Sequence, residues 1–172
     1  EVHIAYCPER VLPGKIMTEM VDNAGRIADA SGLPVISDAD TGYGNPLNVR
    51  RTVRAYEKAG VAAIHLEDQQ LPKKCGHLAG KVLVPAEEMV AKIRAAVDAR
   101  TDPDFVIIAR TDALTVEGFD AALARGRAYE QAGADLVFVE SPLSLAQLEA
   151  IPRAFSVPTL FNMASSGKTP MI

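Results

Sequence analysis

The sequence contains no tryptophan, and aromatic residues make up only 5% of its 172 residues. It also lacks an excess of basic side chains, because 18 lysines and arginines face 22 acidic residues, a formal net charge of −4. Proteins that bind nucleic acids typically present a basic surface and aromatic rings that stack on bases. We therefore expect no nucleic-acid partner.

Cysteine is scarce, and long apolar runs are missing. The two cysteines, Cys7 and Cys75, are too few for a disulfide scaffold. No apolar run reaches the length of about 18 residues that spans a membrane, and no basic segment followed by an apolar one marks a signal peptide. We expect a reducing, cytoplasmic setting and no membrane partner. Because the chain starts at Glu1 without a methionine, we also expect it to be a fragment.

The composition is that of a globular protein, with 48% apolar and 23% charged residues. The length predicts a single domain over residues 1–172 with a sizeable core. Short, continuous apolar runs are typical of strands buried on both faces of a parallel sheet. Six such runs are Val2–Tyr6, Pro34–Ser37, Ala62–Leu66, Phe105–Ala109, Leu136–Val139 and Pro158–Phe161.

Helical patterns lie between these runs, so strands and helices alternate along the chain. The predicted helices are Met17–Ala30, Pro46–Ala59, Pro85–Ala99, Gly118–Ala132 and Ser144–Ala154. A weak internal repeat supports the alternation, because residues 56–67 resemble residues 129–140. Each copy reads as a helix end, an Ala-Gly turn, an apolar strand and a terminal carboxylate. This order predicts an α/β fold with parallel crossovers.

Two architectures fit the alternation, a (β/α)8 barrel and an open doubly wound sheet. The chain has no Gly-x-Gly-x-x-Gly phosphate loop, and the glycine-containing stretch Asp40–Asn45 begins with an acid. Nearly every predicted strand instead ends in a polar residue, and in a barrel such tips converge on one face. We therefore favour the barrel. Only six strands are predicted, so we expect the barrel to be incomplete in this chain.

Three carboxylates stand at the ends of two neighbouring predicted strands. Asp38 and Asp40 are two residues apart, a spacing that puts both side chains on one side of a strand, and Glu67 ends the next strand. Carboxylate oxygens suit Mg²⁺ or Mn²⁺ rather than zinc, in part through bound water. The spacing is also compatible with a structural role, in which Asp40 caps the following turn and Asp38 pairs with a buried arginine.

Other polar residues near the strand ends are candidates for binding and proton transfer. Arg110 is suited to a bidentate grip on a substrate carboxylate, or to a salt bridge with Glu140 or Asp112. Cys75 lies between Lys73-Lys74 and Gly76-His77, and flanking cations favour a thiol that exchanges protons.

The remaining candidates are assigned more modest roles. Gly76 and Gly80 would let the cysteine segment move as a lid. His65 is interpreted as a core histidine with its hydrogen bonds satisfied. The segment that starts at Asn162 is interpreted as an anion-binding loop that uses Ser165 and Ser166, or as a plain connection.

Five motifs along the chain, which are named below in their order, resemble those of the isocitrate lyase and phosphoenolpyruvate mutase superfamily. The resemblance extends from about Met17 to Ile172 and is specific because all five motifs occur together. One departure is that the stretch Tyr6–Glu9 lacks the serine and glycine of the family pattern. The five motifs are Ser37–Asn45, His65–Gln69, Lys73–His77, Ala109–Ala113 and Asn162–Pro170.

This resemblance implies a (β/α)8 barrel, a homotetramer and a Mg²⁺-dependent site that binds a small carboxylate. By position, Asp38, Asp40 and Glu67 match the metal-binding acids of the family. Cys75 matches the general acid of the branch that cleaves carbon–carbon bonds. The residues that match substrate-binding positions, of which Arg110 and Glu140 are also assigned to catalysis, are Arg110, Glu140, Asn162, Gly76 and His77.

The implied activity is a carbon–carbon lyase acting on a hydroxy-dicarboxylate or tricarboxylate such as 2-methylisocitrate, isocitrate or 2,3-dimethylmalate. The products would be a 2-oxo acid or glyoxylate and a carboxylic acid. The alternatives are a phosphonomutase resembling carboxyvinyl-carboxyphosphonate phosphorylmutase, or an oxaloacetate decarboxylase of the same fold. A non-catalytic fragment that associates with other chains is an alternative of a different class.

Overall fold

A computed structural model of the chain describes residues 3–5, 15–163 and 170. Six strands in this part form one parallel sheet, and each strand lies beside the next one in sequence. This consecutive order is that of a (β/α)8 barrel, whereas a doubly wound sheet reverses its strand order at a switch point. The strands are β1 (His3–Ala5), β2 (Val35–Asp38), β3 (Ala63–Glu67), β4 (Val106–Thr111), β5 (Leu136–Val139) and β6 (Thr159–Leu160).

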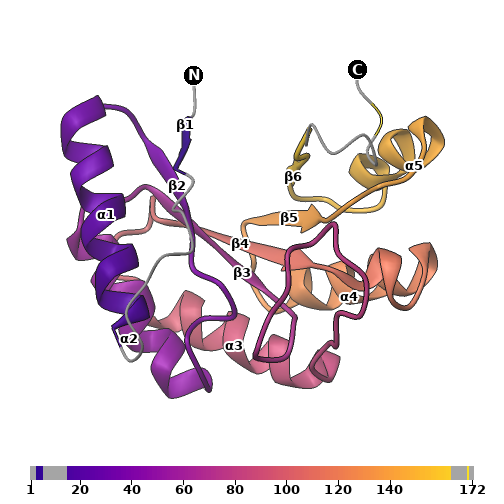
Figure 1. Cartoon of the computed structure of the whole chain (residues 1–172), viewed down its shortest axis with the longest axis horizontal. Coiled ribbons are helices and arrows are strands. Elements are labelled where there is room, and N and C mark those ends of the chain that lie inside the picture. Colours follow the sequence, from indigo (N-terminus) through magenta and orange to yellow (C-terminus); the bar gives the residue numbers. More distant parts are fainter. Residues whose placement is uncertain (1–2, 6–14, 164–169, 171–172) are drawn as a thin grey trace.

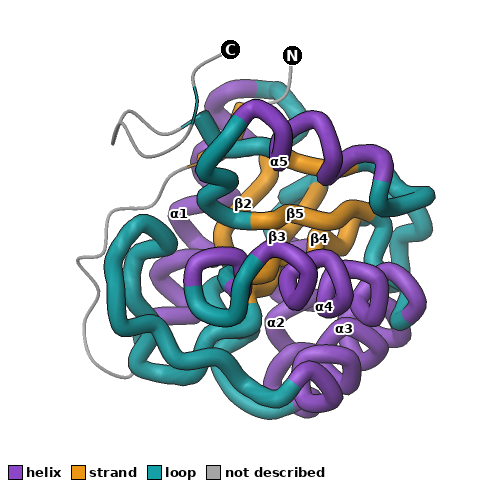
Figure 2. Tube along the Cα trace, turned by 90° about the vertical axis from the view of Figure 1, so that its right-hand side faces the viewer, coloured by secondary structure: helices purple, strands orange, loops and turns teal. Residues whose placement is uncertain are grey.

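Helices α1 to α4 cover the outer side of the curved sheet (Figure 1), and α2, α3 and α4 pack together beneath the strands in the second view (Figure 2). Their ends follow the sequence signals. The side chain of Asn45 accepts hydrogen bonds from the first N–H groups of α2, and α1 ends at the left-handed Gly32. The helices are α1 (Ile16–Ser31), α2 (Pro46–Lys58), α3 (Ala86–Ala99), α4 (Phe119–Gln131) and α5 (Leu145–Ala150).

The last helix is shorter than its sequence pattern predicts. Ser144 caps α5 as expected, by accepting a hydrogen bond from the N–H of Gln147. The helix then ends at Ala150, and a 3₁₀ turn over Ile151–Arg153 follows. The prediction of a helix to Ala154 was wrong because Pro152 has no N–H to continue the α-helical ladder.

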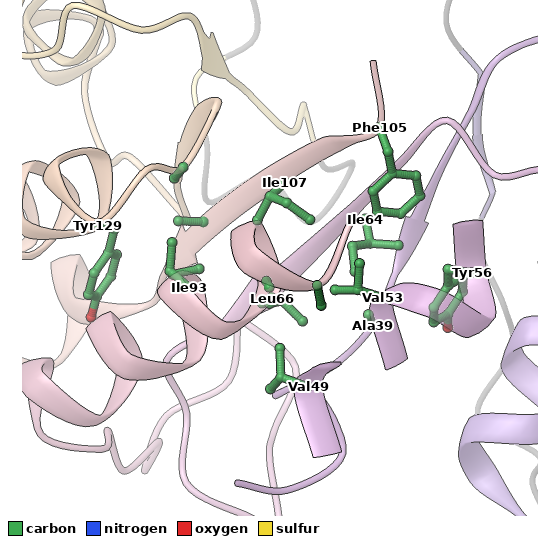
Figure 3. Close-up of a cluster of buried hydrophobic side chains, with 14 of the residues drawn as sticks. Ala39, Val49, Val53, Tyr56, Ile64, Leu66, Ile93, Phe105, Ile107 and Tyr129 are labelled. Carbon is green, nitrogen blue, oxygen red and sulfur yellow. The ribbon is translucent and has the colours of Figure 1, made fainter. Parts of the chain in front are cut away.

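The main core lies between the sheet and helices α1 to α4 (Figure 3). Tyr56 of α2 and Tyr129 of α4 are completely buried there. The opposite, inner face of the sheet carries a second apolar cluster around Ala63, Ile108 and Phe138. The strands are therefore apolar on both faces, as their continuous apolar runs predict.

The strand register places polar side chains side by side at one end of this inner face. Asp38 of β2 is level with His65 of β3, and Glu67 is level with Arg110 of β4. Residues two apart on a strand point to the same side, so His65 and Glu67 share the inner face. That face is consequently apolar where the strands begin and charged where they end.

No helix in the described ranges is long and apolar enough to cross a bilayer.

A carboxylate on α4 holds the segment that leads into β6, and it provides a test of the fold. Glu130 accepts hydrogen bonds from the N–H and hydroxyl groups of Ser156 and from the N–H of Val157. The Ser156 hydroxyl, with the backbone N–H groups, holds the pKa of Glu130 below its ordinary value of 4.5. A carboxyl whose pKa is lowered by folding stabilises the protein above its unfolded pKa, and this stabilisation is lost as the pH falls through the folded value.

We expect Glu130→Gln to lower the free energy of unfolding at pH 7 by about 1 kcal/mol. The substitution turns charge-assisted hydrogen bonds into weaker neutral ones, and solvent already screens the charge of this partly exposed carboxylate, which keeps the loss small. The difference from wild type should shrink as the pH falls below 4.5, as measured by urea unfolding across a pH series. Glu149→Gln, at an exposed position of α5, is the control. An equal loss of stability at pH 7 and at pH 3 would contradict the assignment.

Candidate functional site

Three acids stand at or just after the ends of β2 and β3. Asp38 and Glu67 are the last residues of these strands, and Asp40 follows in a left-handed conformation with φ of 49°. The backbone N–H of Asp40 donates to Oδ1 of Asp38 at 2.7 Å, and the N–H of Glu67 donates to the carbonyl of Asp40 at 2.8 Å. The second of these bonds joins the two strand ends.

A lysine ammonium lies among these acids. Lys73 Nζ is 2.8 Å from Oδ1 of Asp40 and 4.0 Å from Oδ2 of Asp38. Burial lowers the pKa of Lys73, but the charges of Glu67, Asp38 and Asp40 outweigh burial and raise it above its ordinary value. The sequence interpretation assigned Lys73 to the neighbouring thiol, whereas its ammonium contacts the acids.

Glu67 is fully buried, and neither of its carboxylate oxygens accepts a hydrogen bond from any residue that the structure describes. Arg110 Nε lies 3.6 Å from Oε2 of Glu67, an ion-pair contact. Burial raises the pKa of Glu67 to about 8, although the charge of Arg110 opposes this shift. Burial also raises the pKa of Asp40, whereas His65 and Lys73 hold that of Asp38 below its ordinary value despite burial.

The three side chains suit a hard divalent cation, because they offer only carboxylate oxygens. The two oxygens of Glu67 accept no hydrogen bond from the described residues and could therefore bind a cation. As the side chains stand, no three His, Cys, Asp or Glu residues in the described ranges are close enough to hold one ion directly. Mg²⁺ commonly keeps several waters and few protein ligands. The assignment of Asp38, Asp40 and Glu67 to a metal therefore stays a prediction.

Arg110 is held between acids at the centre of the site. It donates to both carboxylate oxygens of Asp112, from Nε at 3.0 Å and from Nη2 at 3.2 Å. Its Nη1 lies 3.4 Å from Oε2 of Glu140, and its guanidinium carbon is 5.3 Å from the centre of the Phe138 ring. The predicted salt bridges of Arg110 are confirmed, and its grip on a substrate stays a prediction.

A buried acid that sequence reasoning did not assign supports this arrangement from behind. Asp68 accepts hydrogen bonds from the Thr111 hydroxyl at 2.7 Å, the Tyr129 hydroxyl at 2.8 Å and the N–H of Asp112 at 2.9 Å. Its carboxylate is completely buried, and burial raises its pKa. The sequence held a signal for the position of Asp68. Side chains alternate between the two faces along a strand, so the neighbour of inward-facing Glu67 is expected to point toward the helices.

The segment that contains Cys75 is an ordered loop. The Gln69 side chain donates to the Lys74 carbonyl at 2.8 Å and accepts from the Lys74 N–H at 3.0 Å. Gln69 also pairs with Leu83 as an antiparallel bridge, which closes the base of the loop. Cys75 is exposed near the tip, as expected for a cysteine outside the core.

The backbone after Cys75 packs against the charged residues of the site. Gly76 is buried, and a Cβ atom built on it would lie 2.5 Å from Nη2 of Arg110 and 2.6 Å from Cγ of Glu140. The next residue, His77, has Nε2 3.4 Å from Oε1 of Glu140. The structure thus brings Gly76, His77, Arg110 and Glu140 together, as the resemblance implied.

Two further sequence assignments concern His65 and the segment after β6. His65 is buried as predicted, but the expectation of satisfied hydrogen bonds was wrong. Its Nδ1 is 3.7 Å from Oδ1 of Asp38 and makes no hydrogen bond within the described part of the chain. Asn162 follows β6 and is exposed, and Ser165 and Ser166 lie outside the described residues, so the predicted anion-binding loop stays a prediction.

Comparison with known proteins places this site in a family. The family model described as phosphoenolpyruvate phosphomutase matches residues 14–171. A 2,3-dimethylmalate lyase of Eubacterium barkeri is 58% identical over 156 residues, which cover 91% of this chain and 54% of the lyase. A 2-methylisocitrate lyase of Shewanella oneidensis is 50% identical over 161 residues, which cover 92% of this chain and 55% of that protein.

Solved structures agree with the sequence relatives. A crystal structure of 2,3-dimethylmalate lyase, described as a PEP mutase/isocitrate lyase superfamily member, aligns with a TM-score of 0.87 and 46% identity over 91% of this chain and 53% of that one. A phosphonopyruvate hydrolase in complex with oxalate and Mg²⁺ aligns with a TM-score of 0.74 and 37% identity over 87% of this chain and 52% of that one.

The chain spans about half the length of the relatives that it matches. That half includes the consecutive parallel strands, the acids at the strand ends and the cysteine loop. The match over residues 14–171 and the identity of 58% leave no other assignment of family. The chain belongs to the phosphoenolpyruvate mutase and isocitrate lyase superfamily, whose fold is the (β/α)8 barrel, and it represents part of such a barrel.

Proposed function

We propose that the protein is a Mg²⁺-dependent lyase that cleaves a carbon–carbon bond in a small hydroxy-dicarboxylate or tricarboxylate. The observation that carries this proposal is the contact of Gly76 with Arg110 and Glu140, because it places the loop of Cys75 over the charged ends of the strands. The relatives named 2,3-dimethylmalate lyase and 2-methylisocitrate lyase support compounds of this class as substrates.

The acids Asp38, Asp40 and Glu67 would hold the divalent cation, whose charge would stabilise an enolate oxygen that forms during cleavage. Arg110 would bind a carboxylate of the substrate, since its buried guanidinium is oriented by Asp112 and faces the same end of the sheet. Glu140 would orient the substrate from the neighbouring strand, beside Arg110 and His77.

The reaction is of the retro-aldol type. A base removes the proton from the substrate hydroxyl, the new carbonyl forms as the carbon–carbon bond breaks, and the bonding electrons pass into an enolate. The thiol of Cys75 then gives its proton to the enolate carbon, which leaves a thiolate on the protein. A 2-oxo acid or glyoxylate and a carboxylic acid are released.

The experiment that tests the proposal is a screen of hydroxy acids with Mg²⁺ for the release of pyruvate or glyoxylate. We expect turnover of 2,3-dimethylmalate or 2-methylisocitrate and loss of turnover after chelation by EDTA. Activity that EDTA leaves intact would contradict a role for the cation. The homotetramer that the resemblance implies stays a prediction, which the mass of the protein in solution would test.

Replacing the thiol separates a lyase from its relatives with other chemistry. We expect Cys75→Ser to lower kcat at least 100-fold, because a hydroxyl is a much weaker acid than a thiol, while Mg²⁺ affinity stays within about 2-fold. Ala79→Ser, at another exposed position of the same loop, is the control. Unchanged kcat in Cys75→Ser would favour a phosphonomutase or a decarboxylase over the lyase.

A further inference from the structure

The carbonyl group of Gly76 faces a buried ammonium. Lys81 Nζ donates a hydrogen bond to the Gly76 oxygen, and only 1% of the Lys81 side chain is exposed. The hydroxyl of Ser141 lies 3.4 Å from the same oxygen. That hydroxyl has one proton and a closer acceptor, Oε1 of Glu140 at 3.0 Å, so the ammonium is the principal donor.

The ammonium is itself fixed by the residues that hold Arg110. Lys81 Nζ is 3.2 Å from Oδ1 of Asp112, the carboxylate that also pairs with Arg110 through two hydrogen bonds. A buried lysine is costly unless it is paired and hydrogen-bonded, and here both conditions are met. Lys81 therefore links the loop backbone to the acid that orients Arg110.

The direction of the Gly76 carbonyl determines what the loop presents to a ligand. In a trans peptide the carbonyl and the following N–H point in opposite directions. Because the carbonyl of Gly76 is directed to Lys81, the N–H of His77 is directed to the other side of this peptide. A carboxylate bound by Arg110 would be repelled by a carbonyl oxygen and attracted by an N–H.

We propose that Lys81 is a positioning residue, which turns the Gly76 carbonyl away from the anion that Arg110 binds and so removes its repulsion from that site. The inference deepens the proposed function and rests on it for the identity of the anion. It gives Lys81 a part in binding the substrate carboxylate, although Lys81 contacts the Gly76 carbonyl and Asp112 and no reacting atom.

The contact itself is tested by hydrogen–deuterium exchange of the ligand-free chain. We expect Lys81→Met to raise deuterium uptake in residues 75–80 at least 10-fold, with helices α2 and α3 unchanged. The matched control is Lys74→Met, because the Lys74 ammonium donates to the Gly80 carbonyl at 2.9 Å on the exposed side of the same loop. Equal uptake in Lys81→Met and wild type would overturn the proposal.

The consequence for binding is tested by titrating Mg²⁺ and then oxalate, the ligand pair bound by a solved relative. Loss of a charge-assisted hydrogen bond predicts oxalate binding weakened about 10- to 100-fold in Lys81→Met, with Mg²⁺ affinity within about 2-fold of wild type. Lys81→Arg, which keeps a buried cation, should recover most of the oxalate affinity. An equal loss in Lys74→Met would overturn the proposal, because it would reflect a generally loosened loop.

Two outcomes separate this inference from the proposed function. If wild type binds no oxalate with Mg²⁺, the proposed function fails and the anion-binding role of Lys81 is overturned with it, whatever the exchange data show for the contact. If Lys81→Met does not fold, Lys81→Gln replaces it, because a shorter neutral side chain also withdraws the ammonium from the Gly76 carbonyl, and we expect at least a 5-fold loss of oxalate affinity. Wild-type affinity for oxalate in Lys81→Gln would then overturn the proposal.

Discussion

Gly76→Ala is expected to lower kcat/KM at least 100-fold without unfolding the protein. The added methyl group would lie 2.5 Å from Nη2 of Arg110 and 2.6 Å from Cγ of Glu140, distances at which the atoms overlap. Arg110 is held by Asp112 and cannot move aside cheaply, so the loop must lift away from the site. Displacing a catalytic segment by about 1 Å can cost 100-fold in rate.

Steady-state kinetics on 2,3-dimethylmalate or 2-methylisocitrate would measure this effect, and circular dichroism would report the fold. Ala79→Val is the control, because this residue is exposed on the same loop. Wild-type kinetics in Gly76→Ala would show that the loop does not need to approach Arg110 closely, and the proposed function would lose its main support.

Asp68→Ala is expected to have the largest effect on stability, a loss of about 3–5 kcal/mol in the free energy of unfolding. The carboxylate is fully buried and accepts three hydrogen bonds, and Nη1 of Arg125 lies 3.6 Å from Oδ2. Its removal leaves two hydroxyls and an N–H without their acceptor in a site that water does not reach, and it takes one of two carboxylate partners from Arg125, which keeps Glu117. Urea unfolding at pH 7 would measure the loss.

The comparison with smaller changes tests the cause. Tyr129→Phe removes one donor and leaves the carboxylate with two, so we expect a loss of about 1 kcal/mol. Asp68→Asn keeps the shape but turns one acceptor into a donor, and its loss should fall between the other two. If Asp68→Ala cost no more than Tyr129→Phe, the hydrogen-bond network would not hold β3, β4 and α4 together.

Much of the fold could be predicted because each strand and helix carries a local signal. The sequence places β5 at its observed bounds and starts α2 at Pro46, where a cap and a proline coincide. The exception is α5, whose amphipathic pattern continues past Pro152 although the helix ends at Ala150. There, a local backbone restriction outweighed the pattern of apolar residues.

The site was predictable only in part. Strand ends converge in a parallel barrel, so the proximity of Asp38, Glu67, Arg110 and Glu140 follows from topology. The position of Lys81 does not, because lysines are almost never fully buried and nothing near it in the sequence marks a partner. Its acceptor, Asp112, lies 31 positions away and comes within reach only when the loop folds back onto β4.

The matched register of β3 and β4 has a consequence for how such a chain tolerates inserted residues. Because Glu67 stands level with Arg110, one extra residue within either strand would turn every following side chain to the opposite face of the sheet. Glu67 would then point into the helix layer, and Leu66 would take its place on the inner face. An added residue in the connection after α3, at Thr101–Asp104, should therefore leave the site intact, whereas an added residue inside β4 should disrupt it.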